Sequence, residues 1–200
     1  MEKYQVIAIE RQFGSGGRQI GSLLAEKLGF KFYEEEILSM AAERLEETVE
    51  YLELLEETVT NNFLENVARV ADFSEDETLA DKLFNAESEI INELALKENF
   101  VIMGHCAGQI IANPESCLSV FIYANEDARI RRATKEYGIH ENEAHGILKR
   151  NDKIRSDFFN TRTDKKWSSM ESYDICLNSE ILGINGCVEV IASLVAPDIK

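Results

Sequence analysis

The sequence contains little proline and no long apolar run, and each absence excludes a class of protein. Only two prolines, Pro114 and Pro197, interrupt the 200 residues, and no low-complexity linker separates one part from another. We therefore predict a single domain spanning residues 1–200. The uncharged apolar stretches run to about five to seven residues, whereas a membrane-spanning helix needs roughly 20. The sequence therefore predicts no membrane association.

Cysteine and histidine are few and scattered. The four cysteines form no CxxC pair, and the three histidines show no spacing typical of metal ligands. They are Cys106, Cys117, Cys176 and Cys187, and His105, His140 and His145. We predict reduced thiols and no metal held by side chains. The N-terminal segment does not resemble a signal peptide, so the expected location is the cytoplasm.

Charge is abundant but unevenly distributed. The net charge of −16 argues against a protein that coats a nucleic acid polymer. Residues 34–98 contain 20 acidic and 4 basic side chains, whereas residues 129–166 contain 11 basic and 6 acidic ones. We interpret residues 34–98 as an acidic helical insert and residues 129–166 as a basic, lid-like region. The basic region suits an anionic ligand, with a solvated basic face as the alternative.

Apolar strands alternate with helices along the chain. The strands are predicted at residues 4–9, 30–33, 100–103, 118–123 and 173–178. The helices are predicted from about residue 17 to Leu28, as two or three within residues 34–98, around Arg129, at about 141–155 and at 183–195. This alternation predicts an α/β fold, with a parallel sheet of about five strands covered by helices on both faces.

A glycine-rich loop joins the first predicted strand to the first predicted helix. Three of its four central residues are glycines, which allow backbone N–H groups to converge on an anion at the positive end of a helix. We therefore predict a phosphate-binding loop, with a tight turn that binds no ligand as the alternative. Its residues are Gly14, Ser15, Gly16, Gly17, Arg18 and Gln19.

The loop departs from the regular Walker A motif, GxxxxGK[ST]. In one register Arg11 stands at the first glycine, Gly17 at the lysine and Arg18 at the Ser/Thr. A shift of one residue gives Arg18 the lysine position and Gln19 the hydroxyl position. Neither register provides a hydroxyl for magnesium. A guanidinium can bind two phosphate oxygens, so we predict that Arg18 replaces the lysine.

These residues resemble the cytidylate kinase-like family, a variant branch of the P-loop nucleoside monophosphate kinases. The resemblance extends in order over nearly the whole chain and is least specific in the acidic block. Its segments are RQFGSGGR at 11–18, VIMGHCAG at 101–108, VFIYA at 120–124, the arginines at 129, 131 and 132, DKIR at 152–155, Trp167, YD at 173–174 and LNS at 177–179. It implies a three-layer P-loop fold and transfer of the γ-phosphoryl group of ATP to CMP or dCMP.

The resemblance also implies roles for individual residues. In cytidylate kinases, arginines from the corresponding segments close over the transferring phosphoryl group, which stabilises its charge. The catalytic set is then Arg129, Arg132 and Arg155, together with Arg18 of the loop. The residues expected at the acceptor are His105, Arg131 and Asp152, and for His105 a structural histidine at a strand end is the alternative. For the arginine cluster, a solvated helix face is the alternative. ATP is the implied cofactor, and Mg²⁺ is carried on its phosphates.

Two alternatives to a kinase stay open on the sequence alone. The first is a non-catalytic nucleotide-binding module, favoured by the missing loop lysine and by His105 and Cys106 at positions where orthodox cytidylate kinases have Arg and Asp. ATP binding without transfer would identify it. The second is a protein–protein surface, such as a homodimer interface, along the apolar stripe of Leu45, Leu52, Leu55 and Val59. In the leading interpretation the partners are small-molecule nucleotides.

Overall fold

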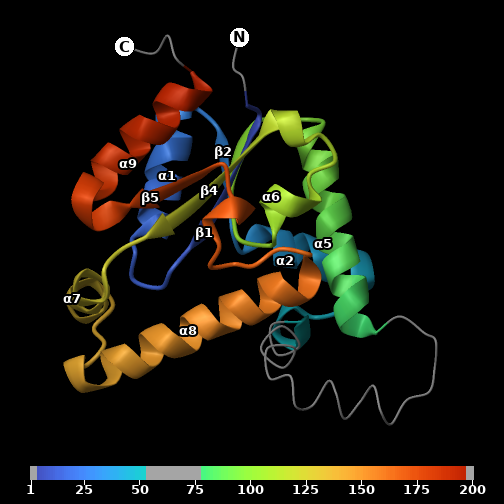
Figure 1. Ribbon diagram of the computed structural model, residues 1–200. Coiled ribbons are helices and arrows are strands. Elements are labelled where there is room, and N and C mark those ends of the chain that lie inside the picture. The colour runs from blue at the N-terminus through green and yellow to red at the C-terminus, as the bar shows by residue number, and fades with distance from the viewer. Residues whose placement is uncertain (1–3, 53–77, 197–200) are drawn as a thin grey trace.

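A five-stranded parallel sheet forms the centre of the protein in the computed structural model, which describes residues 4–52 and 78–196 (Figure 1). The strands are β1 (Val6–Arg11), β2 (Lys31–Tyr33), β3 (Phe100–Met103), β4 (Cys117–Tyr123) and β5 (Ile175–Asn178). Their order across the sheet is β2-β3-β1-β4-β5, and every pairing is parallel. The predicted α/β fold with a parallel sheet is confirmed.

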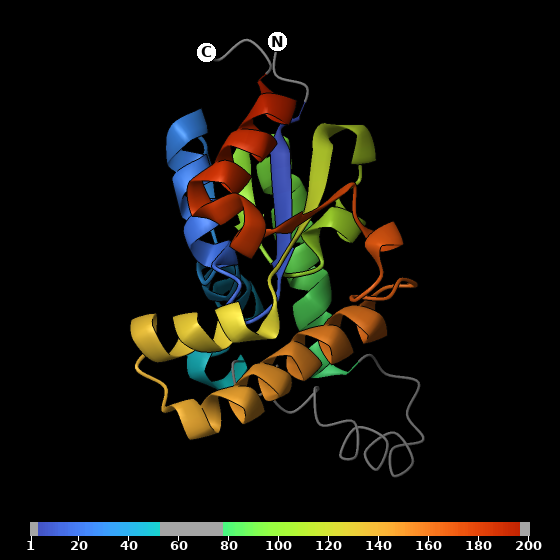
Figure 2. The same ribbon diagram turned by 60° about the vertical axis from the view of Figure 1, so that its left-hand side comes forward.

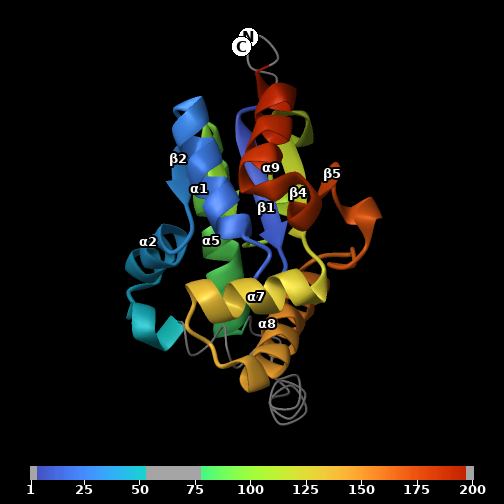
Figure 3. The same cartoon turned by 90° about the vertical axis from the view of Figure 1, so that its left-hand side faces the viewer.

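Helices cover both faces of this sheet and a further pair lies below it. One face carries α1 (Gly17–Leu28) and α9 (Ser179–Val195), and the other carries α2 (Glu36–Leu45), α5 (Leu79–Ala95) and the short α6 (Ala107–Ile110). Figures 2 and 3 show α7 (Glu126–Glu136) and α8 (Glu141–Arg162) lying across the carboxyl ends of the strands. Two short 3₁₀ turns are at Pro114–Ser116 and Met170–Ser172. Ligands of parallel sheets bind at that edge.

The apolar core is divided by the sheet into two layers. Successive side chains of a strand point to opposite faces. Accordingly, Val6 and Ala8 of β1 pack with the α2 and α5 side, whereas Ile7 and Ile9 pack with the α1 and α9 side. A third buried cluster, of Cys106, Phe121, Phe159 and Trp167, lies between the sheet and α8.

Some boundaries differ from those predicted. Helix α8 continues to Arg162, beyond the predicted end near residue 155, because Phe159 is buried in the third cluster. Helix α9 begins at Ser179, and Gly183, with φ 70° and ψ 169°, breaks it at the residue where the helix was predicted to start. Strand β5 begins at Ile175, two residues later than predicted, and α6 was not predicted.

The described part of the acidic segment packs on the sheet. Leu38 of α2 and Ile91 of α5 are both buried in the core layer that includes β1 and β3. Residues 53–77 lie outside the described residues, and with them Leu55 and Val59 of the apolar stripe. Within residues 4–52 and 78–196, no helix combines the length and the apolarity needed to cross a membrane.

Candidate active site

The loop between β1 and α1 has the backbone geometry of an anion-binding site. Gly14 and Gly16 adopt left-handed conformations, with φ of 74° and 81°, and Gly16 immediately precedes α1. No side chain caps this helix. The first N–H groups of an uncapped helix have no partner within the helix, and the helix dipole makes that end positive. This arrangement suits a bound phosphate.

The loop is packed so tightly that its glycines admit no side chain. A Cβ atom added at Gly14 would lie 2.8 Å from the carbonyl oxygen of Arg129, and one at Gly17 would lie 2.6 Å from Cβ of Arg11. Ser15 is fully buried, and its Oγ has no hydrogen-bond partner among the described residues. Its carbonyl oxygen accepts a hydrogen bond from Ser179 Oγ at 2.5 Å. A buried hydroxyl without a partner fits a loop that closes around phosphate oxygens.

Two arginines of α7, Arg129 and Arg132, bind backbone carbonyl groups at the start of the loop. Arg132 Nη1 donates to the carbonyl oxygen of Gly14 at 2.8 Å. Arg129, which is 7% exposed, donates from Nε to the carbonyl of Phe13 at 2.7 Å and from Nη2 to Asp152 at 2.5 Å. Asp152 in turn accepts the N–H of Phe13 at 2.8 Å. The loop, α7 and α8 are therefore joined by one network.

The other predicted arginines face different surroundings. Arg155 of α8 donates to the carbonyl oxygen of Arg11 at 3.1 Å, and its burial lowers the pKa of Arg155 to about 10. Arg18 is exposed, and its Nε donates to Glu34 at 2.5 Å, which raises the pKa of Arg18. Arg131 is also exposed and pairs with Glu180 at 3.1 Å. The structure thus brings Arg129, Arg132 and Asp152 to the loop, whereas the side chains of Arg18 and Arg131 are paired elsewhere.

A cavity of ≈ 540 Å³ opens beside the loop, at the carboxyl ends of β1 and β3. Phe158 and Phe159 of α8 and Leu38 of α2 form part of its apolar wall. Its charged and titratable lining residues are Glu10, Arg11, Glu34, Glu35, His105 and Arg155. Such a cavity has room for a small polar molecule next to the phosphate-binding loop.

Within this cavity, Arg11 and Glu10 have contrasting partners. Arg11 Nη2 donates to Glu34 at 3.1 Å, so Glu34 binds both Arg11 and Arg18. Glu10 accepts the indole N–H of Trp167 at 3.2 Å, and burial is the main cause of the raised pKa of Glu10. The cavity therefore offers both guanidinium donors and a carboxyl group.

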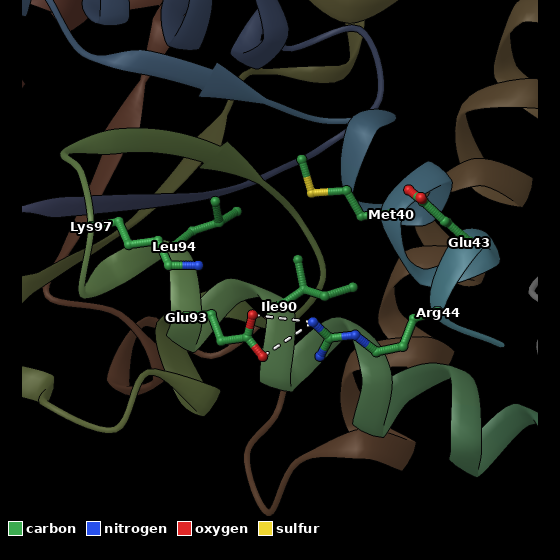
Figure 4. A pocket seen from close by; sticks show the side chains of 7 residues that line it. All are labelled: Met40, Glu43, Arg44, Ile90, Glu93, Leu94 and Lys97. Carbon is green, nitrogen blue, oxygen red and sulfur yellow. Dashed lines mark hydrogen bonds and ion pairs between the residues drawn. The ribbon is translucent and has the colours of Figure 1, made fainter.

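A second cavity, of ≈ 360 Å³, lies between α2 and α5 and is a weaker candidate. Figure 4 shows Arg44 reaching across it to Glu93, with Nη2 3.1 Å from each carboxylate oxygen. This ion pair also lowers the pKa of Glu93. Two of the four charged lining residues, Arg44 and Glu93, are thus bound to each other, and no lining residue belongs to the glycine loop. We therefore place the candidate active site at the loop and the ≈ 540 Å³ cavity.

The residues around the loop fit phosphate better than a metal bound by side chains. Within the described residues, no three His, Cys, Asp or Glu side chains cluster as a metal site. Arg18 stands at the hydroxyl position of one Walker A register, and Asp152 is bound to Arg129 and to the N–H of Phe13.

Five charged residues of this region were not predicted as site residues from the sequence. They are Glu10, Arg11, Glu34, Glu35 and Glu87. For Glu10 and Arg11 a signal existed, because both stand at the carboxyl end of a predicted parallel strand, where ligands bind. Glu34 and Glu87 lie in a glutamate-rich segment that offers no local signal to distinguish them.

Comparisons with known proteins agree with this fold. A model of the cytidylate kinase-like family matches residues 6–181. An uncharacterized protein from Eubacterium ventriosum ATCC 27560 is 25% identical, with a TM-score of 0.69 over 93% of this chain and 94% of that one. Two kinases share the P-loop kinase fold. Shikimate kinase from Bacteroides thetaiotaomicron is 18% identical, with a TM-score of 0.50 over 94% of this chain and 96% of that one. A gluconokinase from Sinorhizobium meliloti 1021 is 14% identical, with a TM-score of 0.51 over 98% of this chain and 97% of that one. No curated protein sequence matches the chain.

Proposed function

The chain belongs to the cytidylate kinase-like family, and from that premise we propose that it transfers the γ-phosphoryl group of ATP to a pyrimidine nucleoside monophosphate, CMP or dCMP. One observation carries the proposal. The glycine loop before the uncapped helix α1 and the ≈ 540 Å³ cavity meet at the end of β1, where Arg11 is the last residue of the strand and also lines the cavity. A donor phosphate on the loop and an acceptor in the cavity would therefore be neighbours, which phosphoryl transfer requires.

The loop provides the donor half of this site. Backbone N–H groups from Gly14 to Gln19 would bind the ATP phosphates, together with the hydroxyl of Ser15. Arg132, which already contacts the carbonyl of Gly14, is placed to add positive charge over the loop. ATP supplies the phosphoryl group, and Mg²⁺ would arrive bound to its phosphates.

Arg155 and Arg11 provide the acceptor half. Arg155 has no carboxylate ion-pair partner among the described residues, and it lines the cavity, so its guanidinium is available to an acceptor phosphate. His105 lines the same cavity from the turn that follows β3. Phosphoryl transfer needs positioned positive charge more than covalent help, and these side chains can supply it.

The remaining predicted residues act less directly in this proposal. Arg129 and Asp152 position the loop through both the N–H and the carbonyl of Phe13. Arg18 and Arg131 must first leave Glu34 and Glu180 before their side chains can bind a nucleotide.

The proposal is tested by phosphoryl transfer from labelled MgATP. The acceptors are CMP, dCMP, UMP and AMP, with shikimate, gluconate and an acceptor-free reaction alongside. We expect a diphosphate product with CMP or dCMP, and none from Arg155→Met. The variant Gly146→Ala, on an open surface of α8, serves as the matched control and keeps full activity.

A non-catalytic nucleotide-binding module is the second candidate. The observation that favours it is the absence of a lysine in the loop, where Gly17 faces Arg11 and the side chain of Arg18 is bound to Glu34. ATP binding by calorimetry, combined with no product from any acceptor, would establish the module and refute the kinase.

A further inference from the structure

The turn that follows β3 is held in an unusual backbone conformation. Gly104, His105 and Cys106 have φ of 80°, 55° and 54°, so three consecutive residues are left-handed. This conformation is unfavourable for His and Cys and persists only where the surroundings fix it. The turn places the His105 ring at the edge of the acceptor cavity.

The two ring nitrogens of His105 both face acceptor groups. Nδ1 lies 3.2 Å from a carboxylate oxygen of Glu87, and Nε2 lies 3.1 Å from the backbone carbonyl oxygen of Glu34. A carboxylate and a carbonyl can only accept hydrogen bonds. The Nε2–H of either a neutral or a doubly protonated ring can donate to the Glu34 carbonyl, whereas the carboxylate 3.2 Å from Nδ1 favours the doubly protonated, positively charged ring.

The buried carboxylate of Glu87 favours a second proton on the His105 ring. Glu87 lies on the core side of α5, with a side chain that is 1% exposed. Neither of its oxygens accepts a hydrogen bond from a described residue, and its ion-pair contact is with His105 Nδ1 at 3.2 Å. A buried carboxylate is costly unless an opposite charge compensates it.

The wider surroundings also favour a positive ring. The charged groups that face it from the elements around it are Glu10 and Arg11 of β1, Glu34 and Glu35 after β2, Glu87 of α5 and Arg155 of α8. Glu34 and Glu35 also pair with Arg18 of α1, so these groups comprise four carboxyl groups and three guanidinium groups.

We propose that Glu87 and His105 form a buried ion pair in which His105 carries both ring protons and acts as a positioning residue for the acceptor cavity. Its Nε2–H holds the backbone of Glu34, whose carboxylate holds the guanidinium of Arg11 at 3.1 Å. The pair thereby fixes a cation at the cavity wall. The ion pair itself does not depend on the proposed function. Only the identification of the cavity as the acceptor site rests on the proposed function.

The protonation state is tested by NMR of the ¹⁵N-labelled full chain, in which His105 is one of three histidines. We expect two ring N–H protons on His105 at pH 8, with the exposed His140 as the reference signal. In Glu87→Gln, His105 should lose the second proton as the pH rises past about 6.5, the ordinary midpoint for histidine. The control Glu89→Gln, on the exposed face of α5, leaves the His105 signal unchanged. A neutral His105 at pH 8 in the unmodified protein overturns the proposal, and that measurement needs no variant.

The positioning role is tested by calorimetry at two pH values. In Glu87→Gln we expect CMP to bind about tenfold more weakly at pH 8, a coupling typical of residues in one network. Binding should recover at pH 6, where His105 regains its proton, while ATP binding is unchanged at both. Equal CMP affinities for Glu87→Gln and Glu89→Gln at pH 8 would refute positioning. If the unmodified protein binds no CMP, the proposed acceptor fails, whereas the NMR result still decides the ion pair.

Discussion

Arg129 is the side chain through which α7 holds the glycine loop. It is buried and bound to Phe13 and Asp152 at once. Because Arg129→Ala leaves a carboxylate without its partner, we expect the free energy of unfolding to fall by about 3 kcal/mol. Arg131→Ala removes an exposed ion pair two residues away and should cost less than ~1 kcal/mol. Urea unfolding measures both, and equal losses would contradict the assignment.

The different contacts of Arg132 and Arg18 predict different losses of ATP affinity when each is replaced by alanine. The Arg132 guanidinium lies against the carbonyl of Gly14, whereas that of Arg18 is turned to Glu34. We therefore expect Arg132→Ala to weaken MgATP binding by roughly 1.5–3 kcal/mol, the value of a charge-assisted hydrogen bond. Arg18→Ala should have the smaller effect in the same calorimetric titration. The reverse order would show that Arg18 leaves Glu34 and replaces the lysine.

At the scale of single residues, the sequence predicts local motifs better than contacts between distant segments. Gly14, Gly16 and Gly17 were identifiable because their spacing itself creates the phosphate-binding geometry. Glu34 and Glu87 were not, because each becomes distinctive only when β2 and α5 place it beside His105. The pairing of Arg18 with Glu34 arises in the same way, from the packing of α1 next to β2.

Among the elements, the loop and α8 respond in opposite ways to the same substitution. Gly14 has φ 74°, and a Cβ there would meet the Arg129 carbonyl oxygen at 2.8 Å, so Gly14→Ala should destabilise the fold and abolish ATP binding. Gly146 lies inside α8 with open space around it. Gly146→Ala should therefore raise the free energy of unfolding by about 0.5–1 kcal/mol. Thermal unfolding distinguishes the two, and a stabilised Gly14→Ala would contradict the loop geometry.

The start of α5 makes stability depend on pH. Thr78 and Asp81 form a capping box, and Asp81 also binds Arg162 at the end of α8 at 2.5 Å. Burial alone would raise the pKa of Asp81, but the hydrogen bonds from Thr78 and Arg162 outweigh it and lower the pKa. A lowered folded-state pKa gives stability that is present above about pH 4 and lost as the pH falls through the lowered value.

Asp81→Asn tests this dependence. We expect a loss of about 1 kcal/mol at pH 7, the typical value of a cap, and a smaller difference from the unmodified protein at pH 3. Urea unfolding at the two pH values measures it. Glu89→Gln, on the exposed face of the same helix, is the control. A difference that does not shrink at low pH would assign the loss to packing instead.

Element boundaries were less predictable than the elements themselves. The strands were identifiable from short apolar runs, which are clearest in β1, β3 and β4 because these inner strands of the parallel sheet are buried on both faces. The length of α8 was not predictable in this way, because its last turns are polar apart from Phe158 and Phe159. These two rings pack in the third buried cluster, between the sheet and α8. Only the tertiary packing of those two rings indicates that the helix continues.

At the scale of the whole molecule, ATP binding should stabilise the entire domain. The loop connects β1 to α1 and is tied to α7, α8 and α9, so a ligand there opposes unfolding of all of them. At 100 times its Kd, a ligand adds ≈ 2.7 kcal/mol, which for a domain of this size raises the Tm by about 5–10 °C. Thermal scans with MgATP measure the shift. No shift in the unmodified protein, or the same shift in Gly14→Ala, would contradict ATP binding at the loop.

The central place of β1 has a consequence for how the chain is made in the cell. Val6 pairs with Phe100 on one side and Cys117 on the other. A ribosome adds roughly 5–20 residues per second, so β1 emerges about 5–20 s before either neighbour exists. During that interval its Val-Ile-Ala-Ile run has no strand to pair with and can be bound by chaperones. Once β3 and β4 have emerged, three adjacent strands can assemble almost together, and the glycine loop forms with them.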